Sequence, residues 1–382
     1  MLVDETGRIA AVGTDDAVPS PPGVPCERFE DAVLLPGLVN AHTHLELTGL
    51  AGAVQEVSFP DWIRRLRQVK PARGPAEVLA AAKQGVRDCW AMGVTAVADT
   101  GDSGAVIQAL AELGGRGICY HEVFGPHPAQ LDESLAGLRS RVGELRRFTS
   151  ERVRLGVSPH APYSVSRPLY RAAAAWAREQ RLPLALHLAE SCEESALVAE
   201  GNGPFAEMWR GRDIPVHAGE GRTPVAWVDE LGVLGADTLC IHMVQATDDD
   251  LAIVAARGAA IAHCPLSNRA HAHGTAPLGA MLRRGIRTGL GTDSVVSVGC
   301  LDLMGEARAA LAIGGLDADT ALRLATLEGA HAIGWGEAIG ALEPGRRGDM
   351  AVFALAAGGP VESVLSGTEV LLTLIDGKVV HR

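Results

Sequence analysis

The sequence predicts a (β/α)8 barrel, an α/β fold, with a small β-sandwich domain attached. Eight short apolar or β-branched runs alternate with alanine-rich segments of helical period, which is the pattern of such a barrel. A length of 382 residues, 47% of them hydrophobic, is enough for one large barrel and a small addition. Histidines and acidic residues follow several of the predicted strands, and barrel enzymes carry their chemistry at that end of each strand.

The strands and helices of the predicted barrel alternate along most of the chain. The eight predicted strands are 34–41, 94–99, 117–123, 153–158, 183–188, 238–242, 260–263 and 287–291. Amphipathic helices are predicted between them at 76–92, 131–149, 168–180, 248–257 and 277–284. Several of these helices are followed by a glycine, such as Gly93 and Gly258, which suits the left-handed residue that ends many helices.

Two terminal segments fall outside the barrel pattern. Residues 1–34 contain one strand-like run after a turn. Residues 336–382 contain further runs at 349–353 and 371–382, separated by glycine-rich turns. We expect the two segments to form one composite β-sandwich domain, and the barrel to occupy 35–335.

Composition and charge exclude several classes of partner. The net charge is −12 and no basic cluster is present, which argues against nucleic acid. No apolar run approaches the roughly 18 residues of a membrane span. The first residues lack the pattern of a signal peptide, and the seven cysteines form no C-x-x-C pair, so a cytoplasmic protein without a disulfide framework is expected. A small-molecule substrate is therefore the expected binding partner.

Histidines and one aspartate stand at the ends of four predicted strands. His42 and His44 end the first strand, and their spacing of two puts both side chains on one face. His187 ends the fifth strand, His242 ends the sixth, and Asp293 follows the eighth. Each residue alone has an ordinary explanation, such as a core histidine or a turn aspartate. Their joint placement favours a metal site, because the barrel brings strand ends together.

The residue types suggest hydrolysis at this site. Imidazole and carboxylate ligands suit Zn²⁺ or Fe²⁺, and such an ion lowers the pKa of a bound water. Asp293 can take a proton from that water, and Glu190, three residues after His187, can protonate a ring nitrogen or a leaving group. His242 can orient the nucleophile or stabilise developing negative charge. His263 also ends a strand, and we assign to it either a structural role or a role in supporting the metal ligands.

Several segments carry a family resemblance. The segments at 36–44 (PGLVNAHTH), 187–190 (HLAE), 263–268 (HCPLSN) and 290–294 (LGTDS) resemble signatures of the amidohydrolase superfamily. Residues 340–349 resemble the return into the small β-sandwich of that family. Together the segments resemble the branch that contains adenosylhomocysteine, methylthioadenosine, guanine and aminodeoxyfutalosine deaminases and the triazine hydrolases.

The resemblance implies a one-metal site. Its ligands would be His42, His44, His187 and Asp293, with Glu190 and His242 as catalytic groups. Binuclear members carry a carboxylated lysine at the end of the fourth strand, and no lysine lies near that strand here. One divalent ion is therefore expected, with zinc favoured and iron as the alternative. The resemblance also suggests a homodimer.

Four residues are candidate substrate contacts. Trp62 resembles a tryptophan that lines the substrate pocket in the family, although it could instead anchor a helix in the core. His160 resembles a loop histidine that contacts the substrate. Glu46 and Arg167 could contact a polar substrate tail, and the alternative is that both are solvated loop residues. Pro60 stands where adenosylhomocysteine deaminases carry a glutamate for the ribose hydroxyls, which argues against that substrate.

These features predict a metal-dependent aminohydrolase that removes an exocyclic amine from a purine nucleoside or a related heterocycle. The segments 42–47 (HTHLEL) and 203–205 (GPF) resemble the aminodeoxyfutalosine deaminase-like group, so a 6-aminodeoxyfutalosine-type substrate is the leading candidate. Two alternative functions would use the same barrel: those of a triazine-type chlorohydrolase and of a cyclic amidase. A third is a non-catalytic, metal-stabilised binding protein, which the complete set of strand-end groups argues against.

Overall fold

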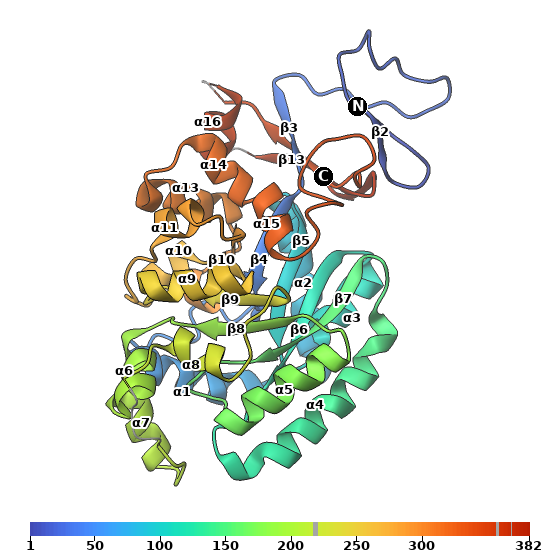
Figure 1. Ribbon diagram of the computed structural model, residues 1–382. Helices are drawn as coiled ribbons and strands as arrows, with labels where there is room; N and C mark the ends of the chain where they lie inside the picture. Colours follow the sequence, from blue (N-terminus) through green and yellow to red (C-terminus); the bar gives the residue numbers. More distant parts are fainter. Residues whose placement is uncertain (217–220, 357–358, 368) are drawn as a thin grey trace.

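The largest unit of the protein is a parallel sheet of eight strands, β4 to β11, rolled into a barrel and wrapped by helices (Figure 1). The computed structural model describes residues 1–382 except 217–220, 357–358 and 368. The barrel strands are β4 (Leu38–Thr43), β5 (Val94–Gly101), β6 (Arg116–Val123), β7 (Val153–Pro159), β8 (Leu184–Leu188), β9 (Thr238–His242), β10 (Ala260–His263) and β11 (Thr288–Leu290). This arrangement confirms the predicted barrel.

The last strand returns to the first and brings two of the predicted site residues together. The backbone N–H of Asp293 donates to the carbonyl of His42 over 3.0 Å. The Asn40 side chain also joins the two strands, because it donates to Thr292 Oγ1 (2.8 Å) and accepts from the Thr292 backbone N–H (3.0 Å). Gly291 permits this approach, since a Cβ there would lie 2.7 Å from the Cβ of His42.

The helices bury one stripe each against the barrel, as their periodicity predicts. In α5, for example, Leu169, Ala173 and Ala177 are buried at spacings of four residues. The helices are α1 (Phe59–Val69), α2 (Pro75–Ala91), α3 (Ala105–Leu113), α4 (Leu131–Leu145), α5 (Arg167–Glu179), α6 (Cys192–Glu200), α7 (Gly203–Arg210), α8 (Pro224–Glu230), α9 (Asp248–Arg257), α10 (Pro265–Ala270), α11 (Leu278–Arg283), α12 (Val295–Val298), α13 (Leu303–Gly314), α14 (Ala318–Leu324), α15 (Leu327–Ala332) and α16 (Pro360–Leu365). None of the described helices is both long and apolar enough to cross a membrane.

The ends of α9 show why these segments stop where they do. Thr247 caps the N-terminus, because its side chain accepts the backbone N–H of Asp250 and the Asp250 carboxylate accepts the backbone N–H of Thr247. Gly258 follows the last residue with φ of +68°, the left-handed conformation that glycine adopts without strain.

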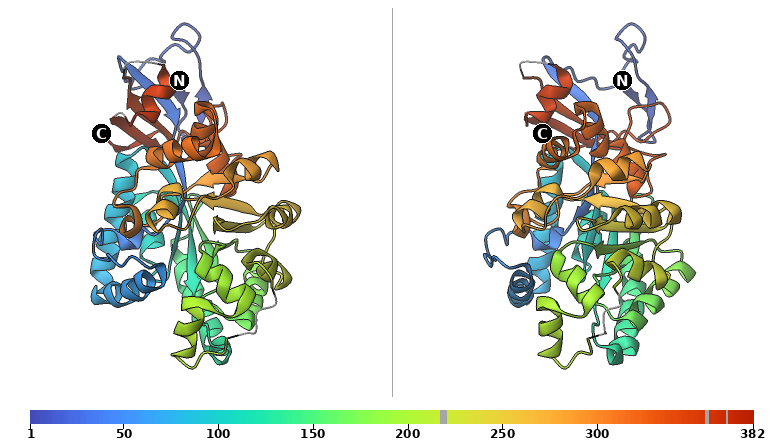
Figure 2. Two further views of the ribbon diagram at one scale, coloured as in Figure 1. Left: turned by 90° about the vertical axis from the view of Figure 1, so that its left-hand side faces the viewer. Right: turned by 60° about the vertical axis from the view of Figure 1, so that its left-hand side comes forward.

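Both termini build a second sheet at the N-terminal end of the barrel (Figures 1 and 2). Its antiparallel strands have the order β14–β13–β12–β3, and a short hairpin of β1 and β2 lies beside it. The strands are β1 (Leu2–Val3), β2 (Ile9–Ala11), β3 (Ala32–Pro36), β12 (Met350–Ala354), β13 (Val370–Ile375) and β14 (Lys378–His381). The extra sheet predicted from the two termini is therefore present.

One predicted strand is wrong in its extent. The run 34–41 was expected to form one strand of the barrel, but it spans two strands, β3 in the small sheet and β4 in the barrel. The break falls at Gly37, where a Cβ would lie 2.1 Å from Thr95 Oγ1. Because the residues on both sides of Pro36-Gly37 are apolar, the sequence pattern does not reveal that the chain passes from one sheet to the other there. The domain boundary at residue 34 stays a prediction, and β3 runs across it.

Candidate metal centre and active site

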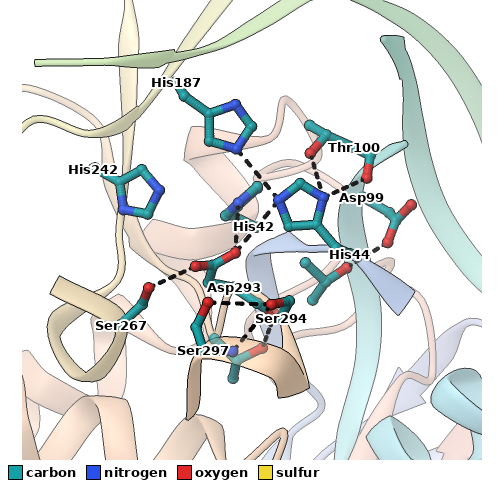
Figure 3. Close-up of polar contacts among 12 residues, drawn as sticks. His42, His44, Asp99, Thr100, His187, His242, Ser267, Asp293, Ser294 and Ser297 are labelled. Carbon is teal, nitrogen blue, oxygen red and sulfur yellow. Dashed lines mark hydrogen bonds and ion pairs between the residues drawn. The ribbon is translucent and has the colours of Figure 1, made fainter. Parts of the chain in front are cut away.

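Four polar side chains converge at the C-terminal end of the barrel (Figure 3). His42 and His44 come from β4, His187 from β8, and Asp293 follows β11. His44 Nε2 lies 3.3 Å from His187 Nε2 and 3.4 Å from Asp293 Oδ1, and that oxygen lies 3.5 Å from His42 Nε2. The three histidines each present a ligand atom within 4.8 Å of the others.

The hydrogen bonds of these histidines suit a metal ion. His44 Nδ1 donates to the carbonyl of Thr100 (2.9 Å), and His187 Nδ1 donates to the carbonyl of His160 (3.2 Å). Burial lowers the pKa of His44 to about 3 and that of His187 well below its usual value, so both rings are neutral and both Nε2 atoms carry a lone pair. Two lone pairs 3.3 Å apart repel unless a cation lies between them.

His42 adds a second sign of a cation. Its side chain is buried, and neither ring nitrogen has a hydrogen-bond partner in the described part of the chain. Buried polar atoms are seldom left without a partner. Three imidazoles and a carboxylate are the donor set that zinc or iron takes in proteins. The residues present therefore fit the metal that the sequence predicts.

Backbone strain accompanies the site. Ala189, His242 and Asp293 have φ of +50°, +74° and +58°, in the left-handed region that favours glycine. Each such residue costs about 1–3 kcal/mol, and such residues cluster at functional sites. Ala189 follows β8, His242 ends β9 and Asp293 lies three residues after β11, so the strained residues stand where the chain leaves the barrel strands.

Glu190 lies next to the four donors in a buried setting. Tyr163 donates its hydroxyl to Glu190 Oε2 over 3.2 Å, and His242 Nε2 lies 3.4 Å from Oε1. Burial raises the pKa of Glu190 well above its usual value, and the nearby charges of Glu194 and Asp293 add to the effect. A carboxyl group that is protonated near neutral pH can serve as a general acid.

The turn that carries Glu190 is fixed by Glu194. Its carboxyl oxygens accept the backbone N–H groups of Ala189 (2.8 Å) and Glu190 (2.9 Å). Burial raises the pKa of Glu194 to about 7. Glu194 is not among the residues predicted from the sequence, although an acid four residues after a candidate acid, at the start of a helix, is a signal for such a role.

The short helix α10 orients two further site residues. Asn268 Oδ1 accepts from His242 Nδ1 (2.9 Å), which leaves His242 Nε2 facing Glu190. Ser267 Oγ donates to Asp293 Oδ2 (2.6 Å) and so leaves Oδ1 facing the histidines. The motif at 263–268 pointed to this segment, but the roles of its serine and asparagine depend on strands distant in sequence.

A cavity of about 230 Å³ opens from this centre. The rings of Tyr163 and Phe205 stack with centroids 4.4 Å apart, and those of Phe59 and Trp62 stack 6.1 Å apart. These four rings, together with Trp209, make the wall apolar and flat, and α1 and α7 supply most of it. Such a wall suits a planar ring system.

The candidate substrate contacts lie in different places. Trp62 and His160 both line the cavity, and Trp62 is also buried against the core. Glu46 is buried beside it, 2.5 Å from Lys70 Nζ, and is absent from the cavity lining. Arg167 begins α5 outside the cavity, in an open depression, 3.7 Å from Glu230.

Comparisons with known proteins agree with this arrangement. The model of the amidohydrolase family matches residues 33–380. The chain belongs to this family. It is 34% identical to an aminodeoxyfutalosine deaminase of Deinococcus radiodurans, over 87% of this chain and 81% of the relative. It is 33% identical to a 5-methylthioadenosine/S-adenosylhomocysteine deaminase of Nitratidesulfovibrio vulgaris, over 98% and 86% of the two chains.

A solved structure supports the same relationship. An adenosine deaminase from Xanthomonas campestris with bound zinc superposes with a TM-score of 0.80 and 27% identity, over 91% of this chain and 80% of that one. The resemblance to the amidohydrolase superfamily, predicted from motifs, is thereby confirmed. The family match and the deaminase-named relatives indicate a hydrolase that acts on C–N bonds, which agrees with the convergent donors and the adjacent buried acid.

Proposed function

We propose that this protein is a metal-dependent deaminase that replaces the exocyclic amine of a purine nucleoside with an oxygen from water. The observation that carries the proposal is the pairing of a converged donor set with one buried carboxyl group beside it, at the end of an aromatic-walled cavity. The relatives at 34% and 33% identity are named as an aminodeoxyfutalosine deaminase and a 5-methylthioadenosine/S-adenosylhomocysteine deaminase, which supports this reaction.

The metal would be held by His42, His44, His187 and Asp293. A divalent ion at this position supplies an activated water at neutral pH. We propose zinc, with iron as the alternative, because both accept imidazole and carboxylate ligands. A single ion is expected, since the four donors share one centre and no lysine follows β7.

The proposed steps use two carboxyl groups of the chain. Asp293 takes a proton from the attacking water, while Glu190 gives its proton to the ring nitrogen next to the carbon that bears the amine. Asp293 then passes its proton to the amine, which leaves as ammonia. Glu190 regains a proton from the added hydroxyl group as the ring carbonyl forms. His242 accepts a hydrogen bond in this site, and Asn268 holds its ring in place.

The alternatives gain less support. A triazine-type chlorohydrolase or a cyclic amidase could use the same barrel, but the relatives above 30% identity are named as nucleoside deaminases. A non-catalytic binding protein would not need a buried acid, set directly after the strained residue Ala189, beside its metal ligands. Among nucleosides, a 6-aminodeoxyfutalosine-type substrate stays the leading candidate, with Trp62 and His160 as proposed contacts.

A substrate panel tests the proposal. Purified protein is incubated with 6-aminodeoxyfutalosine, 5′-methylthioadenosine, S-adenosylhomocysteine, a chlorotriazine and a cyclic amide, and ammonia, chloride and ring opening are scored separately. We expect ammonia from at least one of the nucleosides and no chloride. Chloride release or ring opening without ammonia would contradict the proposal, and so would a lack of turnover on every compound.

Other sequence predictions extend this proposal. The homodimer and the cytoplasmic location are part of it, as is the division into a barrel of residues 35–335 and a small domain of residues 1–34 and 336–382. Sedimentation of the purified protein tests the dimer, and fractionation of the producing cells tests the location.

A further inference from the structure

A buried carboxyl group in the cavity wall has no role in the proposed reaction. Glu122 stands near the end of β6, and its side chain is 4% exposed. It lines the cavity, yet Oε1 has no hydrogen-bond partner among the residues that the structure describes. A buried carboxyl oxygen without a hydrogen-bond partner is unfavourable, so its persistence in a substrate cavity points to a polar group on the ligand.

A second hydrogen-bond acceptor lies beside Glu122. His160 Nδ1 is 2.7 Å from Ser164 Oγ, and Ser164 donates its own proton to the carbonyl of Ala161 (3.1 Å). Ser164 therefore accepts from Nδ1–H, and the neutral ring carries its lone pair on Nε2. This Nε2 lies 3.9 Å from Glu122 Oε1, too far for a hydrogen bond between them.

The lysine in the cavity wall forms no ion pair with Glu122. Lys70 also lines the cavity, but its Nζ lies 2.5 Å from both Glu46 and Asp102, and these ion pairs occupy it. The cavity thus offers two neighbouring polar atoms, the carboxyl oxygen Oε1 of Glu122 and Nε2 of His160, and Oε1 accepts no hydrogen bond from the residues that the structure describes. Two adjacent hydroxyl groups are the chemical group that fits such a pair.

We propose that Glu122 and His160 receive the 2′- and 3′-hydroxyl groups of the ribose, and that this pair selects ribonucleosides over deoxynucleosides. The inference rests on the proposed function, because it takes the ligand to be a nucleoside. Glu122 is thereby a specificity-determining residue for a reaction whose chemistry occurs at the neighbouring metal centre.

A second cation is the competing explanation for the same residues. Ligand atoms of Glu122, His160 and His187 lie within 4.8 Å of one another. Neither ring nitrogen of His187, however, is available to such an ion, because Nδ1 donates to the carbonyl of His160 and Nε2 faces His44. Only two ligands would remain for such an ion, which is fewer than metal sites in proteins use.

The test compares matched substrates in matched variants. Values of kcat/KM are measured for 5′-methylthioadenosine and for its 2′-deoxy and 3′-deoxy analogues. In the native protein we expect a preference for the ribonucleoside of roughly 10-fold or more, because a missing hydroxyl leaves a buried acceptor unpaired. Glu122→Gln and Glu122→Met should reduce this preference to about 2-fold, chiefly through KM of the ribonucleoside. Glu133→Gln, which changes an exposed acid on α4, is the charge-matched control and should keep the preference.

Three outcomes would overturn the inference: no ribose preference in the native protein, a preference that survives in both Glu122 variants, or a fall in bound metal from two ions to one per chain in Glu122→Gln.

Calorimetric binding of adenosine and 2′-deoxyadenosine to the metal-loaded protein separates this inference from the proposed function. A ribose preference in binding that the Glu122 variants lose supports the inference even where no ammonia is released. Ammonia release without any ribose preference contradicts the inference alone.

Discussion

Two buried polar clusters stand at opposite ends of the barrel, and they differ in how their charges are satisfied. At the N-terminal end, Arg116 binds Asp349 (2.5 Å) and Asp376 (2.7 Å), and Asp376 also binds Arg152 (2.6 Å). At the C-terminal end, both ring nitrogens of His42 lack a hydrogen bond within the described residues.

The difference separates a structural cluster from a functional one. The Arg116 cluster is complete, because each of its buried charges has a partner of opposite charge, and it ties the small sheet to β6. The cluster around Asp293 is incomplete and strained, with left-handed backbone at three strand ends. An incomplete buried cluster is retained where a ligand completes it.

The largest expected effect is on chemistry. Glu190→Gln removes the proposed proton donor, and kcat should fall by roughly 10²–10⁴-fold. The metal content should be unchanged, because Glu190 is not among the proposed ligands. Glu193→Gln, three residues further along the chain in the first turn of α6 and outside the cavity lining, is the matched control. Steady-state ammonia release and elemental analysis of both variants provide the measurement, and full activity in Glu190→Gln contradicts the assigned role.

The opposite cluster should respond in stability. Arg116→Met leaves the Asp349 carboxylate buried without its arginine partner and removes one of the arginines beside Asp376, and breaking a buried ion pair costs about 3–5 kcal/mol. Urea unfolding should show this loss, while the folded fraction retains its metal and its kcat. An Arg116→Met variant with native stability, or a stable one that loses its metal, would contradict the assignment of a structural role to one end of the barrel and a functional role to the other.

A smaller effect is expected from the residues that orient the site. Ser267→Ala frees Asp293 Oδ2 and Asn268→Ala frees His242 Nδ1, and the loss of such supporting contacts typically costs about 10–100-fold in metal affinity or activity. Ser267→Ala should weaken metal binding, whereas Asn268→Ala should lower kcat at constant metal content. Competition with a metal-binding dye and steady-state kinetics distinguish the two. Identical effects of both variants would contradict the separate roles.

The smallest effect concerns pH. Burial lowers the pKa of His263 to about 4, from about 6.5 in an unfolded chain. The unfolded state therefore binds more protons than the folded state between these values, so stability falls as the pH drops from about 6.5 to about 4. In metal-free protein, His263→Gln should flatten this dependence of Tm on pH relative to the native chain. His381→Gln on β14 is the control, and an unchanged slope in His263→Gln would contradict the assignment.

The sequence was most informative about the barrel and the strand ends. Alternation of strands and helices predicted the fold, and the rule that function lies at strand ends selected His42, His44, His187 and Asp293. Glu122, near the end of the third strand, also follows this rule, although it was not among the predicted site residues.

Other features could not be read from the sequence. Glu46 follows the His42-x-His44 motif closely, yet the short helix Leu45–Leu47 carries it to Lys70 and Ser103 instead of into the cavity. The roles of Ser267 and Asn268 require the packing of α10 against strands β9 and β11, which no local pattern specifies. Gly37 marks a change of sheet that depends on the position of Thr95.

The central claim is that the unsatisfied cluster at the C-terminal end is a one-metal hydrolytic centre. Metal-free protein titrated with Zn²⁺ tests it most directly, with bound metal and ammonia release from the best nucleoside of the panel followed in the same samples. Activity should rise from background and level off at one ion per chain, and His187→Asn should show neither the binding nor the activity. Full activity in metal-free protein, or a plateau reached only at two ions per chain, would contradict the account.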